Sequence, residues 1–349
     1  MPIGEASWPD DPPPRRPQDP DPADCCGEGC VRCIFDVHDE AMERYETALA
    51  AWRERHPAAP ETGHPGETPR KSSETKWIAI TREVGPALDA CELSYLARVA
   101  IDVERARAQH RAYRNALTAL GCDVLVLPAE PALPDSVFVE DVAVVLDEAA
   151  VMTRPGALSR RAEGASVAAV LRRYRNLLAI ESPATLDGGD VLRTGRTLHV
   201  GESARSNAAG IAQLQALVAS FGYAVRGVPT RGCLHLKSAV TQLDDATLLV
   251  QPDWVDHAAF TGFRLIETDP DEAHAANVLR IGGAVVMPAG FPRTRQRLVA
   301  AGFDVVTVDV SELQKAEGAV TCCSLVFRAA GSVTHRGSEP HAHPMDARA

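Results

Sequence analysis

Between Trp77 and Phe327 the chain repeats one pattern, and this repetition restricts the fold more than any other feature of the sequence. Each copy has two short apolar segments joined by an acidic turn, then a segment with a helical apolar face, then an outgoing apolar segment. Copies begin near Val137, Leu186 and Leu234, a spacing within the roughly 20–50 residues of repeat and propeller architectures. We therefore predict an α/β fold of ββαβ units, five of which would close into a ring without a long exposed sheet edge.

Polar residues occupy comparable places in these copies, close to the start of each expected strand pair. These residues are Glu140, Asp141, Asp187, His235 and Cys322. Equivalent positions in a closed ring of repeats face one axis. Side chains that are far apart in sequence could therefore line one site.

Composition and charge exclude several classes of protein. The 349 residues are 45% apolar and 24% charged, as in soluble globular proteins. A net charge of −11 without a basic cluster argues against nucleic-acid binding, and no apolar run approaches the ~20 residues that span a bilayer. Nine cysteines, an odd number in a large chain that shows no secretory signal, argue against a disulfide framework and predict a reducing cytoplasm.

The N-terminal region differs from the repeats. Residues 1–24 are rich in proline and aspartate and are expected to be disordered, like residues 331–349. Four cysteines follow the leader: Cys25, Cys26, Cys30 and Cys33. Such closely spaced thiols suit zinc or an iron–sulfur centre, although reduced thiols without metal explain them as well. Residues 34–56 have the spacing of an amphipathic helix, and residues 57–74 form a linker rich in Pro, Gly and polar residues.

The segment PDSVFVEDVAV concentrates acidic residues on an expected strand. Glu140 would share a face with Phe138 there, while Asp141 would point the other way. Together with Asp135, these carboxylates and the aromatic ring suit a planar guanidinium, which takes bidentate hydrogen bonds and a stacking face. A solvated acidic turn explains the same residues.

Four further residues are candidates for proton transfer and anion binding. Asp187 adjoins a Gly-Gly pair, which a tight turn alone would explain. His235 lies between two leucines, so it is either packed in the core or placed for proton transfer near neutral pH. Arg160 and Arg205 precede expected helices, where the helix dipole does not stabilise a cation. Binding of an anion would explain the positions of both arginines, and a surface ion pair would explain them as well.

The segment SELQKAEGAVTCCSLVF contains two adjacent cysteines, Cys322 and Cys323, between a polar loop and an apolar run. A cysteine with histidine and acids elsewhere in the chain is a candidate nucleophile. Burial as two small core residues is the alternative.

The motifs PDSVFVEDVAV, TRPGALSRR, TLDGGDVL, RGCLHLKS and SELQKAEGAVTCCS occur in this order. Over residues 77–327 they resemble the dimethylarginine dimethylaminohydrolases, a family of guanidine-modifying enzymes with a five-bladed α/β propeller. The resemblance implies that Cys322 is the nucleophile, His235 the general acid and base, and Asp187 the residue that orients His235.

The resemblance also implies a set of substrate contacts. Asp135 and Glu140 would bind the guanidinium, with Asp141 nearby. Arg160 and Arg205 would hold the α-carboxylate. Leu93 and Ala316 would touch the substrate through flexible loops. The sequence departs from the family's Arg-Thr-Asn at Arg205-Ser206-Asn207.

The implied reaction converts Nω-methylated arginine to citrulline and dimethylamine or methylamine through a covalent thiouronium intermediate, without a cofactor. Arginine deiminase or amidinotransferase activity of the same superfamily is the alternative, as is a metal-binding regulatory protein without activity. We expect a free guanidino amino acid as the partner, and either a monomer or a homodimer.

A second resemblance covers residues 10–56, which are similar to a small oxidoreductase-like N-terminal domain that the main family normally lacks. This resemblance does not establish redox activity. The predicted organisation is a leader (1–24), a cysteine-rich block (25–56), a linker (57–74), a catalytic domain (75–330) and a tail (331–349).

Overall fold

The computed structural model describes residues 76–329 and, nearer the N-terminus, scattered positions between 11 and 17 and between 41 and 55. The chain divides into two units, Met1–Ser72 and Ser73–Ala349, which we consider separately. In the first unit, the described positions between 41 and 55 are helical, as the apolar spacing predicts. The Trp52 side chain is buried there, and its indole N–H donates to the backbone carbonyl of Asp11 at 2.8 Å.

Several expectations lie outside the described residues. They are the four clustered cysteines, most of the leader, the linker and the whole C-terminal tail. The metal site expected at Cys25, Cys26, Cys30 and Cys33 therefore stays a prediction.

The second unit contains five three-stranded sheets. In each sheet the outer two strands flank a central one, which is antiparallel to one neighbour and parallel to the other. The strands are β1 (Trp77–Arg82), β2 (Cys122–Leu127), β3 (Ala143–Val145), β4 (Ala149–Met152), β5 (Asn176–Ala179), β6 (Val191–Thr194), β7 (Thr197–Glu202), β8 (Ala224–Pro229), β9 (Val240–Gln242), β10 (Thr247–Val250), β11 (Arg264–Glu267), β12 (Leu279–Ile281), β13 (Ala284–Pro288), β14 (Asp304–Val308) and β15 (Leu325–Arg328).

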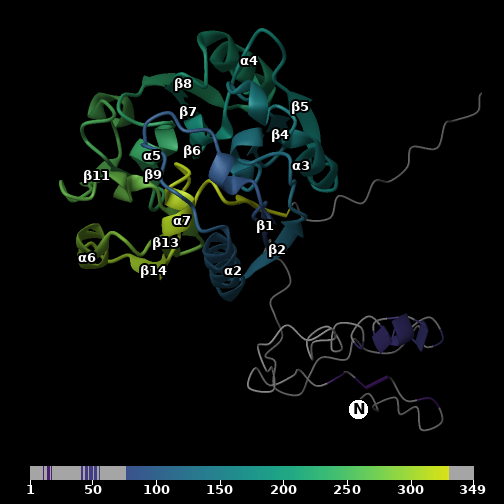
Figure 1. Cartoon of the computed structure of the whole chain (residues 1–349). Helices are drawn as coiled ribbons and strands as arrows, with labels where there is room; N and C mark the ends of the chain where they lie inside the picture. The colour runs from purple at the N-terminus through teal and green to yellow at the C-terminus, as the bar shows by residue number, and fades with distance from the viewer. Residues whose placement is uncertain are drawn as a thin grey trace, which may run out of the picture. The chain divides into compact units, whose positions relative to one another are not determined.

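The sheets form the blades of a ring (Figure 1). Four blades each use consecutive strands, from β3-β4-β5 to β12-β13-β14, but the fifth has the order β15-β1-β2. In that blade β15 is antiparallel to β1, with Leu325 opposite Ile80. The last strand of the unit thus completes the blade that the first strand begins, and this pairing closes the ring.

Helices connect the central and outgoing strands of four blades and cover their outer faces (Figure 1). They are α2 (Val103–Ala119), α3 (Gly164–Leu171), α4 (Ala208–Val218) and α6 (Pro292–Ala300). In the shorter fourth repeat a 3₁₀ turn, η7 (His257–Phe260), takes the place of the helix. Side-chain caps begin two of the helices: Asp102 accepts a hydrogen bond from the Arg105 N–H, and Asn207 accepts one from the Gly210 N–H. No helix in the described part of the chain has the length and apolar composition needed to cross a bilayer.

Short helical turns precede the first strands of four blades, and three of these turns contain or directly follow the polar residues that the repeats predict. They are η3 (Val139–Val142), η5 (Gly188–Asp190), α5 (Leu236–Ala239) and η8 (Ala273–Ala276). A turn at residues 321–323 precedes β15 in the same way. The remaining short elements are η2 (Leu88–Ala90), η4 (Leu158–Arg160), η6 (Ala219–Phe221) and α7 (Ser311–Gln314).

One prediction about these turns is wrong. Glu140 and Asp141 lie in the 3₁₀ helix η3 and not on an alternating strand. Both side chains are buried, and buried carboxylates need donors close by. The turn provides them: Asp141 accepts a hydrogen bond from the Gly189 N–H, and Glu140 contacts Lys237 and Thr321.

Candidate active site

The turns and adjoining loops bring eight of the eleven predicted site residues to one small cavity. Its lining includes Asp135, Phe138, Asp141, Arg160, Arg205, His235, Ala316 and Cys322. The volume open to the centre of a water molecule is about 10 Å³, which is room for about one water, so the cavity is almost closed. Of the other predicted residues, Asp187 contacts His235, Leu93 is half-buried in the loop before α2, and Glu140 lines a different cavity.

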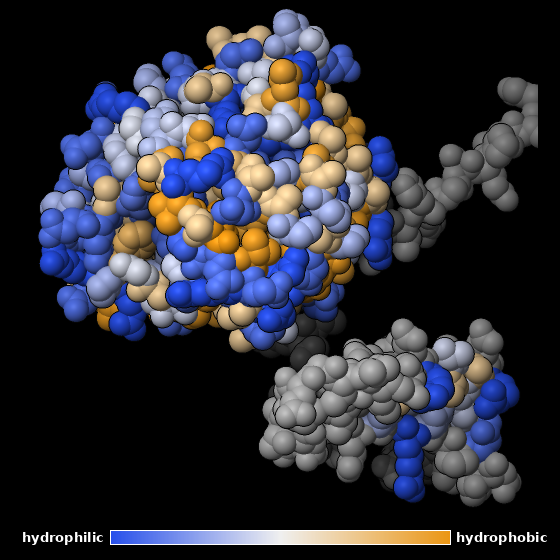
Figure 2. All heavy atoms as spheres, in the orientation of Figure 1, coloured by the Kyte–Doolittle hydropathy of each residue, from blue (hydrophilic) through white to orange (hydrophobic). Residues whose placement is uncertain are grey.

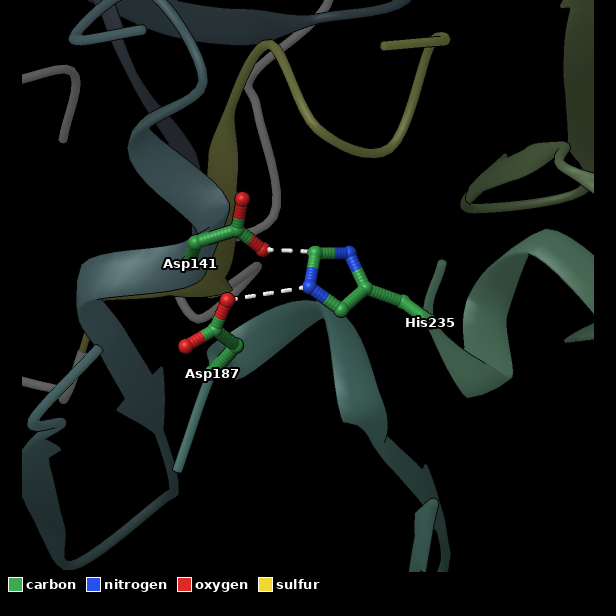
Figure 3. Close-up of side chains that lie close together, drawn as sticks. All are labelled: Asp141, Asp187 and His235. Carbon is green, nitrogen blue, oxygen red and sulfur yellow. Dashed lines mark hydrogen bonds and ion pairs between the residues drawn. The ribbon is translucent and has the colours of Figure 1, made fainter. Parts of the chain in front are cut away.

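His235 is the residue before α5, and two carboxylates lie on the same side of its imidazole ring (Figure 3). Its Nε2 is 3.0 Å from Oδ2 of Asp187, and its Nδ1 is 3.7 Å from Oδ1 of Asp141. The other carboxylate oxygen of Asp187 accepts a hydrogen bond from the Gly156 N–H at 2.9 Å. Burial disfavours the imidazolium, but the surrounding carboxylates outweigh burial and raise the pKa of His235 to about 9. The ring is therefore protonated at neutral pH.

Asp141 connects His235 to a buried arginine. Its Oδ1 accepts the Gly189 N–H at 2.9 Å, and its Oδ2 accepts from Nη1 of Arg160 at 2.5 Å. Burial alone would raise the pKa of this carboxyl, but the positive charges of His235 and Arg160 lower it to about 2. Asp141 is thus ionised beside the imidazolium.

Arg160 is more fully paired than the sequence indicates. Its Nε and Nη2 donate to Glu163, and Nη2 also donates to the backbone carbonyls of Asp135 and Phe138. In this structure the guanidinium neutralises buried acids, and its contact with a substrate carboxylate stays a prediction. Burial raises the pKa of Glu163 to about 7, against the lowering effect of Arg160.

Arg205 has a different environment. It lies in the loop between β7 and α4, and its Nη2 donates to Oγ of Ser94 at 3.1 Å. Its Nη1 is buried and has no hydrogen-bond partner among the described residues. Because Arg205 also lines the cavity, this nitrogen offers a positive donor for an anionic group.

The thiol of Cys322 is buried at the cavity wall. Burial, followed by the nearby carboxylates of Glu140 and Asp141, raises its pKa to about 12. The backbone N–H of Glu140 donates to the carbonyl of Cys322 at 3.2 Å, which fixes the turn. Cys323 does not line the cavity, and its Sγ donates to the carbonyl of Ala319. Of the two adjacent cysteines, only Cys322 is placed to meet a substrate.

Glu140 faces away from this cavity. Its carboxylate accepts hydrogen bonds from Nζ of Lys237 at 2.5 Å and from Oγ1 of Thr321 at 2.7 Å. Asn277 completes the group, because its amide donates to Thr321 Oγ1 and accepts the Thr321 N–H. Direct contact of Glu140 with a guanidinium stays a prediction, while its bonds in the structure hold the turn that carries Cys322.

Asp190 and Ser206 position the histidine. Asp190 accepts the backbone N–H of Leu236, at the start of α5, and the hydroxyls of Ser203 and Ser206. The Ser206 hydroxyl also accepts the backbone N–H of Asp187 at 3.1 Å. A threonine, which the family pattern has at this position, would offer the same hydroxyl, so the departure at Ser206 preserves these hydrogen bonds.

Sequence reasoning missed several residues of this site: Glu163, Lys237, Asn277, Glu317 and Thr321. Two signals could have found some of them. Glu163 follows Arg160 at the i+3 spacing of a helical ion pair. Asn277 lies two residues before β12, close to the place that His235 and Asp187 occupy in their repeats.

Asp141, Asp187 and His235 also form a group of potential metal ligands, with donor atoms within 4.8 Å of one another. Both oxygens of Asp141 already accept hydrogen bonds, one of them from the cationic Arg160. A positive guanidinium beside a ligand carboxylate opposes a further cation. The charge of Arg160 therefore disfavours a metal ion at this group of residues.

Comparison with known proteins gives two family matches. Residues 89–328 match the family described as "N,N dimethylarginine dimethylhydrolase, eukaryotic", and residues 12–54 match "Oxidoreductase-like protein, N-terminal". The chain is 41% identical over 252 residues to an N(G),N(G)-dimethylarginine dimethylaminohydrolase of Streptomyces coelicolor, covering 72% of this chain and 96% of that protein. It is 38% identical over 228 residues to the Pseudomonas aeruginosa protein of the same name, covering 65% and 90%.

Solved structures share the ring. A mutant of the Pseudomonas aeruginosa enzyme complexed with citrulline superposes with a TM-score of 0.70 at 35% identity, covering 73% of this chain and 100% of that chain. The N-terminal domain of a cyanobacterial arginine dihydrolase gives a TM-score of 0.64 at 18% identity, covering 72% and 98%, and at this identity the likeness concerns the fold alone. The predicted five-bladed α/β propeller is confirmed.

Proposed function

Because the chain belongs to the dimethylarginine dimethylaminohydrolase family, we propose that it hydrolyses Nω-methylated arginine to citrulline and dimethylamine or methylamine. The observation that carries this proposal is one acid-lined cavity that holds both the buried thiol of Cys322 and the imidazolium of His235. The same cavity presents carboxylates for a cationic guanidinium and an unpaired arginine nitrogen for a carboxylate.

Substrate binding follows from the charges that line the cavity. Asp135 would attract the guanidinium, and the ring of Phe138 would supply an apolar wall beside it. Burial raises the pKa of Asp135, so a cationic substrate would favour its ionised form. At the other end of the substrate, Nη1 of Arg205 would donate to the α-carboxylate.

The first half of the reaction forms the covalent intermediate. The substrate cation beside Cys322 favours the thiolate, and the thiol proton leaves to solvent. The thiolate attacks the guanidinium carbon, the bond to the methylated nitrogen breaks, and His235 protonates the departing amine. Asp187 holds Nε2, which leaves Nδ1 as the nitrogen that transfers the proton. The product of this half is a thiouronium on Sγ of Cys322.

The second half regenerates the enzyme. Neutral His235 takes a proton from water, and the resulting hydroxide adds to the thiouronium carbon. The carbon–sulfur bond then breaks, the hydroxyl proton passes to sulfur, and the ureido product forms. His235 is again an imidazolium and Cys322 again a thiol. Every step uses side chains of this chain, so the proposed reaction requires no cofactor.

We further propose that the protein works in the cytoplasm. The nucleophile must stay a free thiol, and a reducing compartment keeps it so. The cysteines of the described part of the catalytic unit are all free thiols: Cys91, Cys122, Cys233, Cys322 and Cys323.

Product identity tests the proposed activity. The purified chain is incubated with N,N-dimethyl-L-arginine or with L-arginine, and citrulline, dimethylamine and ammonia are measured separately, with Cys322→Ser as the blank. We expect citrulline and dimethylamine in equal amounts from the methylated substrate and much slower turnover of arginine. Release of ammonia from arginine at a comparable rate would instead identify a deiminase.

A further inference from the structure

The loop over the active-site cavity is bound by one carboxylate that the reaction does not use. Glu317 accepts hydrogen bonds from three successive backbone N–H groups of this loop. The N–H of Ser94 lies 3.0 Å from both carboxylate oxygens, and those of Tyr95 and Leu96 lie 2.5 and 2.6 Å from Oε1. Glu317 itself follows Ala316 in the segment that leads to Cys322. One side chain thus joins the loop before α2 to the loop that carries the proposed nucleophile.

The backbone at Glu317 supports a specific role. Its φ is 58°, and within the described residues it alone has a positive φ without being glycine. A side chain disfavours this conformation, which persists where the surrounding contacts hold it and which concentrates at functional sites. The hydrogen bonds to the loop before α2 are contacts of that kind.

Glu317 also separates two cavities. The first is the almost closed active-site cavity. The second, which we call the vestibule, has about 390 Å³ open to the centre of a water molecule, and its lining includes Tyr95, Leu96, His274 and Phe291. Three residues line both: Leu234, Glu317 and Gly318. If Glu317 released the loop, the active-site cavity, which is too small for the substrate, would join the vestibule, which is large enough for it.

Groups of the active site hold the same loop. Asp135 accepts the N–H of Glu92, and Arg205 donates to the hydroxyl of Ser94. The loop crosses the ring in Figure 1, and Figure 2 shows apolar surface near the middle of that face. The side chains of Tyr95 and Leu96 are 51% and 37% exposed, so burial of these apolar groups does little to hold the loop closed. Polar contacts, chiefly those of Glu317, keep it in place.

We propose that Glu317 is the latch of the active site: its carboxylate holds the loop of residues 92–98 closed over Cys322 and releases it to admit substrate from the vestibule. Glu317 is a positioning residue, since it acts on the loop and not on the reacting atoms. The identity of the substrate rests on the function proposed above, but closure of the cavity over Cys322 does not.

Alkylation of Cys322 by two thiol reagents of different size tests the latch. Iodoacetamide is the small reagent and a bulky N-aryl maleimide the large one, and labelling of Cys322 is followed by peptide mass spectrometry. The full-length wild type is compared with Glu317→Ala, Glu317→Gln and Glu317→Asp. Glu104→Gln, which alters an exposed ion pair on α2, is the control.

We expect Glu317→Ala to speed bulky labelling by about tenfold, because three charge-assisted hydrogen bonds are lost. Small-reagent labelling should rise much less, while Glu317→Asp and Glu104→Gln stay close to wild type. Equal acceleration with both reagents would indicate a change in thiol pKa and would overturn the latch, as would unchanged labelling of Glu317→Ala and Glu317→Gln.

Turnover gives an independent measurement. With dimethylarginine as substrate, the loosened loop of Glu317→Gln should lower kcat/KM by about tenfold, partly through a higher KM. The melting temperature should stay close to that of wild type. A lower melting temperature with unchanged labelling would assign Glu317 to stability only. If the wild type does not hydrolyse dimethylarginine, the labelling experiment still decides whether the latch exists, so the two proposals fail separately.

Discussion

At the residue scale, the free site holds its two reactive groups in the protonation states that precede catalysis. Burial and neighbouring acids keep Cys322 a thiol, with a pKa of about 12, while carboxylates keep His235 an imidazolium, with a pKa of about 9. In the proposed mechanism, attack would therefore wait for the cationic substrate, which favours the thiolate, while His235 would already hold the proton that the leaving amine needs.

The histidine gives a pH prediction. The proposed acid is active while His235 is protonated, so kcat should fall as pH rises through about 9. Removing a negative neighbour destabilises the imidazolium and lowers its pKa, so Asp187→Asn should move the descending limb to lower pH. The measurement is kcat against pH for both proteins, at saturating substrate. If kcat falls at the same pH in both proteins, a group other than His235 controls the fall.

Gly189 gives a steric prediction. A Cβ at this position would lie 2.5 Å from Nδ1 of His235 and 2.6 Å from Oδ1 of Asp141. Gly189→Ala should therefore displace the imidazole and lower kcat by on the order of 100-fold, the scale of a misplacement of about 1 Å. Gly283→Ala is the matched control, because a Cβ there meets nothing within 4 Å. Similar activity of the two variants in steady-state assays would contradict the geometry at His235.

At the scale of elements, the site is a set of turns and loops held by the blades. Strand and helix positions could be predicted from apolar spacing, because the repeats obey simple periodicities. The path of a buried acid could not, since it depends on partners from other blades: Glu140 turns toward Lys237 and Thr321. Ion pairs of this kind become visible only when the ring has closed.

The loop before α4 carries a prediction about substrate choice. Loss of a buried charge-assisted contact costs about 1.5–3 kcal/mol, or about tenfold or more in binding. Arg205→Ala should therefore raise KM strongly for N-methylated arginine. It should have much less effect on agmatine, which lacks the carboxylate. Steady-state kinetics of both substrates provide the measurement, and equal losses on the two would show that Arg205 is structural.

At the scale of the whole molecule, pairing of β15 with β1 ties the proposed nucleophile to ring closure. Cys322 lies three residues before the start of β15, in a cavity that it shares with residues from three other blades. The repeats therefore predict which residues meet. They say nothing of the N-terminal unit, whose cysteines no repeat explains.

The division into two units leads to a prediction about that region. Every predicted catalytic group lies after Ser73. A variant that begins at Ser73 should fold and keep most of the activity of the full chain, as judged by circular dichroism and steady-state kinetics. Failure to fold would mean that the N-terminal unit supports the core of the propeller.

In the proposed reaction Cys322 forms a thiouronium by expelling the methylated nitrogen, and the mass of the trapped adduct tests this step. Wild type and Cys323→Ser are quenched in acid during turnover of monomethyl- or dimethyl-L-arginine, and the peptide that contains Cys322 is analysed by mass spectrometry. We predict the same adduct from both substrates in both proteins, because the amine that carries the methyl groups has left, and none in Cys322→Ser. An adduct that retains methyl groups, or one attached to Cys323, would contradict this account.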